Sequence, residues 1–129
     1  ETEPRLRGML RLAGYIPNSD LPAIYNEASA FLYTSLRESF GIPQLEAMAC
    51  GTPVVTSAAS AIPEVAGQGA ILVDPTDPTA IADALLRLET DTEFRAGQVA
   101  YGLERVKQFS WEKTARHLLA LYESLGKTN

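Results

Sequence analysis

Residues 38–55 read ESFGIPQLEAMACGTPVV, and the local structure that this stretch specifies decides the fold. Glu38 and Glu46 lie eight positions apart, one before a Gly-Ile-Pro turn and the other inside the helix that the turn begins. Proline suits the first turn of a helix, because its fixed φ is already helical and its missing N–H loses no hydrogen bond. The free backbone N–H groups from Gly41 to Leu45 then point out of the helix start, where the helix dipole favours an anion.

Two carboxylates beside an anion site repel the anion, unless they bind hydroxyl groups on either side of it. A nucleotide-sugar has this layout, with ribose hydroxyls, then a diphosphate, then the hydroxyls of the sugar. The placement of Glu38 and Glu46 around the turn therefore indicates a nucleotide-sugar site.

Length and composition fit one globular domain. The chain has 129 residues, which is enough for a hydrophobic core of its own. Apolar residues make up 46% and charged residues 21%, as in ordinary soluble proteins. The net charge is −5 and the sequence pI is about 4.8. Because a nucleic-acid partner requires a basic face, this balance argues against nucleic-acid binding.

The sequence carries few signals of targeting. It has no run of about 18 apolar residues, so we expect no membrane-spanning helix. Residues 1–4 are polar, so we expect no signal peptide. The single cysteine, Cys50, cannot form an internal disulfide, which fits a reducing compartment. We therefore expect a cytoplasmic protein.

Hydrophobic periodicity and turn signals predict alternating strands and helices. Short apolar runs predict strands over residues 10–15, 30–34, 52–56 and 70–73. Helical spacing and capping residues predict a helix tail over 5–9 and helices over 20–28, over 43–50, from Asp77 onward, over 92–107 and from Ser110 onward. The alternation predicts an α/β fold, a Rossmann-like parallel sheet of about four strands flanked by helices, with right-handed crossovers.

Two of the expected helices have clear apolar stripes. In the helix that begins at Asp77, the inner stripe consists of Ile81, Leu85 and Leu88. The last helix has the clearest stripe in the chain, and we expect it to pack in the core or against another domain. Its members are Trp111, Ala115, Leu118, Leu119, Tyr122 and Leu125.

The stretch 38–55 resembles the E-x7-E signature of the family 4 retaining glycosyltransferases, also called group 1, which have the GT-B fold. Three further blocks extend the resemblance over nearly the whole chain: SAIPEV at 60–65, LVDP at 72–75 and FSW at 109–111. The resemblance implies that residues 1–129 form a single, truncated nucleotide-sugar-binding domain, the later part of the C-terminal domain. An N-terminal acceptor domain and the first strands of this domain are expected to lie outside the chain.

The resemblance assigns roles to both glutamates. Glu46 matches the glutamate that binds the ribose hydroxyls, and its carboxylate can accept both hydrogens of a cis-diol. Glu38 matches the catalytic glutamate beside the anomeric carbon of the donor sugar, where it would stabilise developing positive charge. In the alternative interpretation, Glu46 only stabilises the helix by its interaction with the helix dipole, and Glu38 is a solvated acidic residue of the loop.

The remaining donor-binding positions act through the backbone. Phe40, Gly41 and Ile42 match positions whose amides meet the sugar hydroxyls, and Leu45 matches one whose N–H reaches the diphosphate. Gly41 also permits close backbone approach, because it has no side chain. Ile16 matches a position where backbone groups meet the nucleobase. The side chain of Phe40 is expected to pack and fix the loop.

The resemblance implies metal-independent, retaining transfer of a hexose, with mannose as one candidate, to a glycan or lipid-linked acceptor in polysaccharide biosynthesis. No cofactor is expected, and the substrate would be GDP-mannose or a UDP-sugar. We assign no metal role to His117, because no second ligand pattern accompanies it. Cys50 is expected to be a small buried residue rather than a nucleophile.

The basic pair that binds the diphosphate in the family has no counterpart in the chain, so we expect the isolated chain to be inactive. We expect the parent protein to be cytoplasmic or peripheral at the inner membrane face. The truncated sheet edge predicts self-association. Two other functions stay open: a non-catalytic nucleotide-binding or assembly module, and part of a nucleotide-sugar epimerase.

Overall fold

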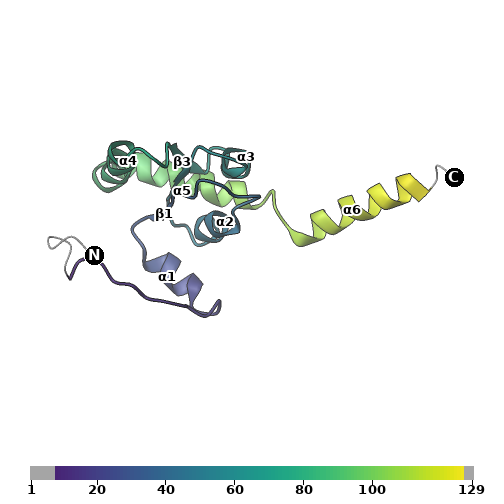
Figure 1. Ribbon diagram of the computed structural model, residues 1–129, viewed down its shortest axis with the longest axis horizontal. Helices are drawn as coiled ribbons and strands as arrows, with labels where there is room; N and C mark the ends of the chain where they lie inside the picture. The colour runs from purple at the N-terminus through teal and green to yellow at the C-terminus, as the bar shows by residue number, and fades with distance from the viewer. Residues whose placement is uncertain (1–7, 127–129) are drawn as a thin grey trace.

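A parallel sheet in the order β1-β2-β3 lies at the centre of the computed structural model, which describes residues 8–126 (Figure 1). Its strands are β1 (Phe31–Tyr33), β2 (Val54–Ser57) and β3 (Ala70–Val73). The register pairs Phe31 with Val54, and Val54 with Ala70. All four residues of β2 are buried, as expected for the central strand of a parallel sheet with both faces covered.

Six helices surround or extend this sheet within the described residues. They are α1 (Leu21–Glu27), α2 (Ile42–Ala49), α3 (Ile62–Ala66), α4 (Pro78–Thr90), α5 (Thr92–Val106) and α6 (Trp111–Gly126). Successive strand residues point to opposite faces of the sheet. Val54 accordingly belongs to a core cluster with Met48 of α2, and Val55 belongs to one with Leu88 of α4. The α/β class and the parallel sheet predicted from the sequence are confirmed.

The predicted helix starts are also confirmed by their capping bonds. The Asp77 carboxylate accepts the backbone N–H groups of Thr79 and Ala80 at 2.9 and 3.1 Å. Ser110 Oγ accepts the N–H of Lys113 at 3.1 Å. The stripe of α4 is correct as well, because Leu88 is buried and Ile81 and Leu85 pack beside it.

Helix α2 lies very close to α5, and glycines make this approach possible. A Cβ atom on Gly102 would lie 3.2 Å from Met48 Cγ and 3.5 Å from the carbonyl oxygen of Gly69. Since α2 carries the signature stretch, this contact helps to fix the position of the predicted site.

The prediction of a strand over residues 10–15 is wrong. In the structure these residues run extended but have no paired strand, so the described sheet has three strands instead of four. The side chains of Leu10, Leu12 and Tyr15 are 56%, 88% and 88% exposed. An apolar run becomes a strand only through hydrogen bonds to a neighbour, and no strand of the described residues lies beside this one. Of the helix tail expected over 5–9, residues 5–7 lie outside the described part, and Gly8 and Met9 form a turn.

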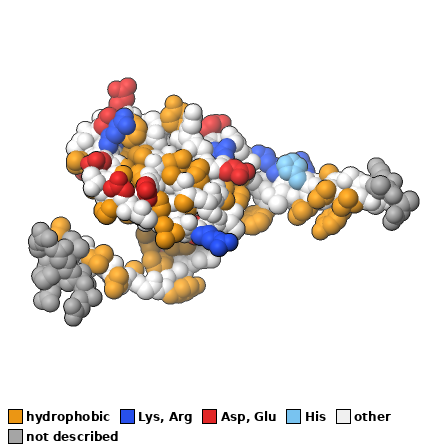
Figure 2. All heavy atoms as spheres, turned by 45° about the horizontal axis from the view of Figure 1, so that its top comes forward, with side chains coloured by type: hydrophobic (Ala, Val, Ile, Leu, Met, Phe, Trp, Pro, Cys, Tyr) orange, Lys and Arg blue, Asp and Glu red, His pale blue; other side chains and the backbone are white. Residues whose placement is uncertain are grey.

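The prediction that the stripe of α6 packs in the core is also wrong. Helix α6 projects away from the body, and hydrophobic side chains remain visible along it (Figures 1 and 2). Trp111 is 81% exposed and Tyr122 is 68% exposed. The helix is amphipathic, but most of its apolar face is exposed in the described residues. Packing against another domain stays a prediction. Among the described helices, none combines the length and hydrophobicity needed to cross a bilayer.

Candidate functional site

The signature loop lies where two strands of the sheet end. Residues 34–41 follow the carboxyl end of β1, and residues 58–61 follow that of β2. Because parallel strands end at the same edge, the two loops meet there, and ligands of open α/β sheets bind at this edge. Ser60 joins the loops: its Oγ donates to the carbonyl oxygen of Glu38 at 2.7 Å and accepts the Glu38 N–H at 3.4 Å.

Ser60 makes these bonds from a strained backbone conformation. Its φ of 58° lies in the left-handed region, and no other non-glycine among the described residues has a positive φ. Such a conformation costs about 1–2 kcal/mol for a residue with a side chain. The two hydrogen bonds to Glu38 offset this strain and fix the backbone of the loop.

The carboxylate of Glu38 is oriented by Tyr33, the last residue of β1. Tyr33 Oη donates to Glu38 Oε1 at 2.5 Å, and Glu38 is half-buried. Burial, followed by the hydrogen bond to Glu38 and the charge of that carboxylate, raises the pKa of Tyr33 to about 12. The phenol therefore stays protonated and remains a donor at neutral pH.

The carboxylate of Glu46 has a similar partner. Tyr25 of α1 is 8% exposed, and its Oη donates to Glu46 Oε2 at 3.3 Å. Burial, followed by the charge of Glu46, raises the pKa of Tyr25 to about 12. Glu46 itself is exposed, so its carboxylate is accessible to a ligand.

Phe31 connects the two tyrosines. Its ring meets Tyr25 edge-on, with centroids 5.2 Å apart, and stacks on Tyr33 at 5.8 Å. Within residues 8–126, neither Glu38 nor Glu46 takes part in an ion pair. The donors that orient the two carboxylates are therefore neutral phenols.

The start of α2 has the glycine and the first-turn proline where the sequence predicts them. Gly41 precedes the helix with φ 86° and ψ 56°, and no side chain caps the helix. Pro43 lies in the first turn, as expected. A Cβ atom on Gly41 would lie 3.0 Å from Gln44 Nε2 and 3.6 Å from Tyr33 Cε1, so this position requires glycine. Gln44 is fully buried, and its Oε1 has no hydrogen-bond partner among residues 8–126.

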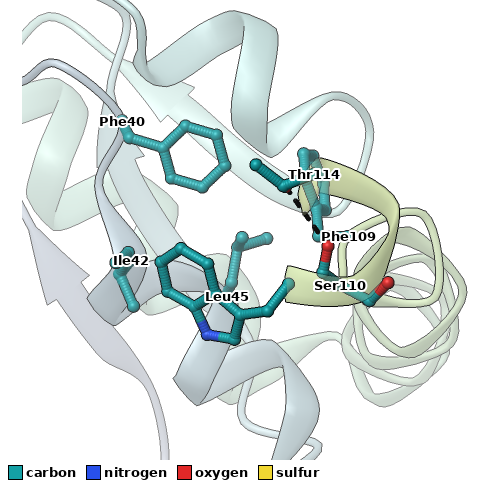
Figure 3. A pocket seen from close by; sticks show the side chains of 7 residues that line it. Phe40, Ile42, Leu45, Phe109, Ser110 and Thr114 are labelled. Atoms are coloured by element: carbon teal, nitrogen blue, oxygen red, sulfur yellow. Dashed lines mark hydrogen bonds between the residues drawn. The ribbon is translucent and has the colours of Figure 1, made fainter. Parts of the chain in front are cut away.

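The side chains of three predicted site residues point elsewhere. Phe40, Ile42 and Leu45 face the start of α6 across an apolar cavity of about 440 Å³ (Figure 3). The other residues that line this cavity are Phe109, Ser110, Trp111 and Thr114. Phe40 packs edge-on against Phe109, with ring centroids 5.6 Å apart, so its side chain does fix the loop. This placement leaves backbone contacts as the way in which the three residues could meet a donor.

Glu38 and Gly41 thus precede α2 and Glu46 lies within it, and the tyrosines that contact the two glutamates are joined through Phe31. Ile16 lies apart along the chain, half-buried in the extended segment before α1. Cys50 is half-buried beside the core cluster of Met48, which agrees with a packing role. His117 is exposed on α6, and the described residues contain no cluster of metal-ligating side chains.

Sequence reasoning missed the partners of the two glutamates. Tyr33 lies in a strand that was predicted, and Tyr25 lies in a helix that was predicted, but both contacts depend on tertiary structure. Ser60 was quoted only as part of the block 60–65. The positions of Tyr33 and Ser60 in the sequence could have indicated them as site residues. Both lie at or just beyond the carboxyl end of a strand, where ligands of open α/β sheets bind.

Comparison with known proteins gives matches over most of the chain. Residues 3–105 match the family described as glycosyl transferases group 1. An O-antigen chain mannosyltransferase B of Escherichia coli is 42% identical over 118 residues, covering 92% of this chain and 31% of the relative. A D-inositol 3-phosphate glycosyltransferase of Salinispora tropica is 44% identical over 109 residues, covering 80% of this chain and 22% of the relative.

Solved structures resemble this chain in fold as well as in sequence. A sucrose-phosphate synthase from Thermosynechococcus elongatus superposes with a TM-score of 0.85 at 32% identity, over 97% of this chain and 32% of the synthase chain. The C-terminal domain of a group 1 glycosyl transferase from Francisella tularensis gives a TM-score of 0.66 at 32% identity, over 74% of this chain and 50% of that domain. The chain spans less than a third of the length of the two curated relatives named above. The matched residues, the identity and the shared fold place this chain in the group 1 glycosyl transferase family.

Proposed function

We propose that this chain is the donor-binding part of a metal-independent, retaining glycosyltransferase. One observation carries the proposal: Glu38 and Glu46 lie on either side of the uncapped start of α2, at the carboxyl edge of a parallel sheet. This edge is where open α/β folds bind ligands. A nucleotide-sugar matches the arrangement in the order of its groups.

Each part of the donor has a proposed partner. The ribose diol donates to the accessible carboxylate of Glu46, which can accept two hydrogen bonds at once. The diphosphate lies at the first turn of α2, where the Leu45 N–H meets it. The sugar lies beside Glu38, with Phe40, Gly41 and Ile42 offering backbone amides. Ile16 meets the nucleobase through its backbone.

In catalysis, Glu38 would act where positive charge develops at the anomeric carbon. A charged carboxylate near that carbon stabilises the transition state more than the ground state. The proposed chemistry needs no metal or other cofactor.

The proposed donor is GDP-mannose, with a UDP-sugar as the alternative. Two Escherichia coli relatives are named as mannosyltransferases, at 42% and 36% identity, which supports a mannosyl donor. A glycan or lipid-linked acceptor is proposed on the same ground, and a cytoplasmic or peripheral location fits such substrates. Family membership also favours a glycosyltransferase over a nucleotide-sugar epimerase.

The 129-residue chain alone should bind a donor without transferring the sugar. Neither glutamate forms an ion pair within the described residues, and the basic pair that the family resemblance implies for the departing diphosphate has no counterpart in the chain. Stabilisation of a leaving group is a large part of the barrier in such reactions. We propose that residues outside this chain supply the cation and the acceptor site.

Calorimetric titration of the chain with GDP and with UDP tests the proposal. We expect saturable binding of one nucleotide and loss of that binding in Glu46→Ala. Glu89→Ala, on the exposed side of α4, is a matched control and should bind as the original chain does. Binding that survives in Glu46→Ala would contradict the ribose role, and binding of neither nucleotide would favour a non-catalytic assembly module.

A further inference from the structure

We infer that Tyr33 and Tyr25 are positioning residues of the donor site, which orient the carboxylates of Glu38 and Glu46 from the protein side. The inference rests on the proposed function, because it concerns the same two glutamates. Neither tyrosine belongs to the signature stretch 38–55. They come from β1 and α1, so the site includes elements that precede the signature in the chain.

Tyr33 and Ser60 together fix Glu38 at two points. Tyr33 Oη binds the carboxylate at 2.5 Å, and Ser60 Oγ binds the backbone carbonyl of Glu38 at 2.7 Å. A glutamate side chain in solution samples many rotamers, and ordering it on binding reduces affinity. A glutamate that is already oriented avoids most of this loss. One hydrogen bond also leaves several lone-pair positions of the carboxylate free for a sugar hydroxyl.

Contacts with the core fix the position of Tyr25, whose hydroxyl group contacts Glu46. Its ring is buried against Phe31, and its carbonyl oxygen accepts a hydrogen bond from Thr52 Oγ1 at 2.6 Å. Its hydroxyl then binds Glu46 Oε2 at 3.3 Å. Because Glu46 lies in α2 and Thr52 lies just before β2, Tyr25 links the orientation of Glu46 to the sheet.

The choice of tyrosine has a chemical consequence. An arginine or lysine would also orient a carboxylate, but its charge would cancel part of the negative charge. A phenol donates a hydrogen bond and stays neutral. Glu38 therefore keeps the charge with which it would stabilise an electron-poor anomeric carbon.

The Tyr33–Glu38 pair should affect binding of the sugar, and the Tyr25–Glu46 pair should affect binding of the nucleotide. This difference distinguishes a positioning role from a general loss of structure, which would weaken both. Removing the Tyr33 hydroxyl should reduce the affinity that GDP-mannose gains over GDP and leave GDP binding unchanged. Removing the Tyr25 hydroxyl should weaken GDP and GDP-mannose equally. The cost of ordering one flexible side chain on binding predicts an effect of about 3- to 10-fold in each case.

The experiment measures dissociation constants of GDP and GDP-mannose for the chain and for Tyr33→Phe, Tyr25→Phe and Tyr101→Phe. If the chain prefers uridine, UDP and UDP-glucose replace them. Phenylalanine keeps the ring packing, and thermal unfolding of each variant reports whether the fold is intact. Tyr101 is an exposed tyrosine on α5 without a glutamate partner in the described residues, so its variant should match the original chain.

A double-mutant cycle then tests whether the tyrosines act through the glutamates. Tyr33→Phe should have no further effect in a Glu38→Ala background, and Tyr25→Phe none in Glu46→Ala. Additive effects, or Tyr→Phe variants that bind as tightly as the original chain, would overturn the positioning inference alone. If the original chain binds no nucleotide or nucleotide-sugar, the proposed function fails and the inference fails with it.

Discussion

At the scale of single residues, the site depends on backbone conformations that most side chains do not adopt. Gly41 has φ 86° at the entry to α2, and Ser60 has φ 58° in the neighbouring loop. The sequence favoured glycine at position 41 because a residue without a side chain permits close backbone approach, whereas its positive φ is a finding of the structure. The strain at Ser60 had no such signal, since its two hydrogen bonds go to Glu38 across the sheet edge.

We predict that Gly41→Ala destabilises the chain and weakens nucleotide binding. The new Cβ would lie 3.0 Å from Gln44 Nε2, and left-handed φ adds about 1–2 kcal/mol for alanine. Urea unfolding measures the stability, and GDP titration measures the affinity. Gly14→Ala is the matched control, because Gly14 also has positive φ but has no neighbour within 4 Å. Equal effects of both variants on GDP binding would contradict the account of Gly41.

The tyrosine hydroxyls predict a stability change at high pH. The pKa values of Tyr25 and Tyr33 rise to about 12 in the folded chain, from the ordinary value of 10.0. Their contribution to the free energy of unfolding is fully present below about pH 10, where the phenols are protonated in both the folded and the unfolded chain. It is lost as the pH rises toward 12, because the unfolded state deprotonates first. Urea midpoints should therefore fall above about pH 10, and less so in the Tyr25→Phe, Tyr33→Phe double variant. Equal slopes would contradict the raised pKa values of the two tyrosines.

At the scale of elements, local signals predicted much and tertiary contacts decided the rest. The caps Asp77 and Ser110 and the strand at residues 70–73 were predicted correctly, because those signals lie within a few residues of the element. The strand at 10–15 was wrong, because a strand also requires a partner that no local pattern contains. The Tyr25–Glu46 contact was missed for the same reason, as its residues lie 21 positions apart.

The contact between α2 and α5 leads to a prediction for Gly102→Ala. Alanine in a helix interior gains about 1 kcal/mol of propensity over glycine. At position 102 the Cβ would lie 3.2 Å from Met48 Cγ, and overpacking costs about 1–3 kcal/mol. We expect net destabilisation and weaker GDP binding, because α2 must move. Gly97→Ala, in the same helix with no neighbour within 4 Å, should instead stabilise the chain. Stabilisation by both variants would rule out a close helix contact.

At the scale of the whole molecule, the chain exposes apolar surface that a sequence pattern cannot assign to a partner. Amphipathic spacing predicted the apolar face of α6 but not that the described residues would leave it uncovered. Exposed apolar surface and an open sheet edge both favour association. We propose that copies of this chain associate through these surfaces.

Light scattering across a range of concentrations tests this association. We expect the mass to rise with concentration, and to rise less in a Leu118→Glu, Tyr122→Glu double variant, which adds charge to the exposed face of α6. Glu123→Gln is the control, because it changes the charge of the same helix without placing a charge on its exposed apolar face. A monomeric mass at all concentrations would contradict the association.

The central claim is that a nucleotide-sugar binds where Glu38, the start of α2 and Glu46 meet. Its most direct test is an NMR titration of the isotopically labelled chain with GDP and GDP-mannose, followed through the backbone amide signals. The account predicts the largest shifts at Ile42, Gln44 and Leu45, with saturation at one equivalent of ligand, and additional shifts near Glu38 with GDP-mannose. Shifts that centre on another part of the chain, or none at saturating ligand, would contradict it.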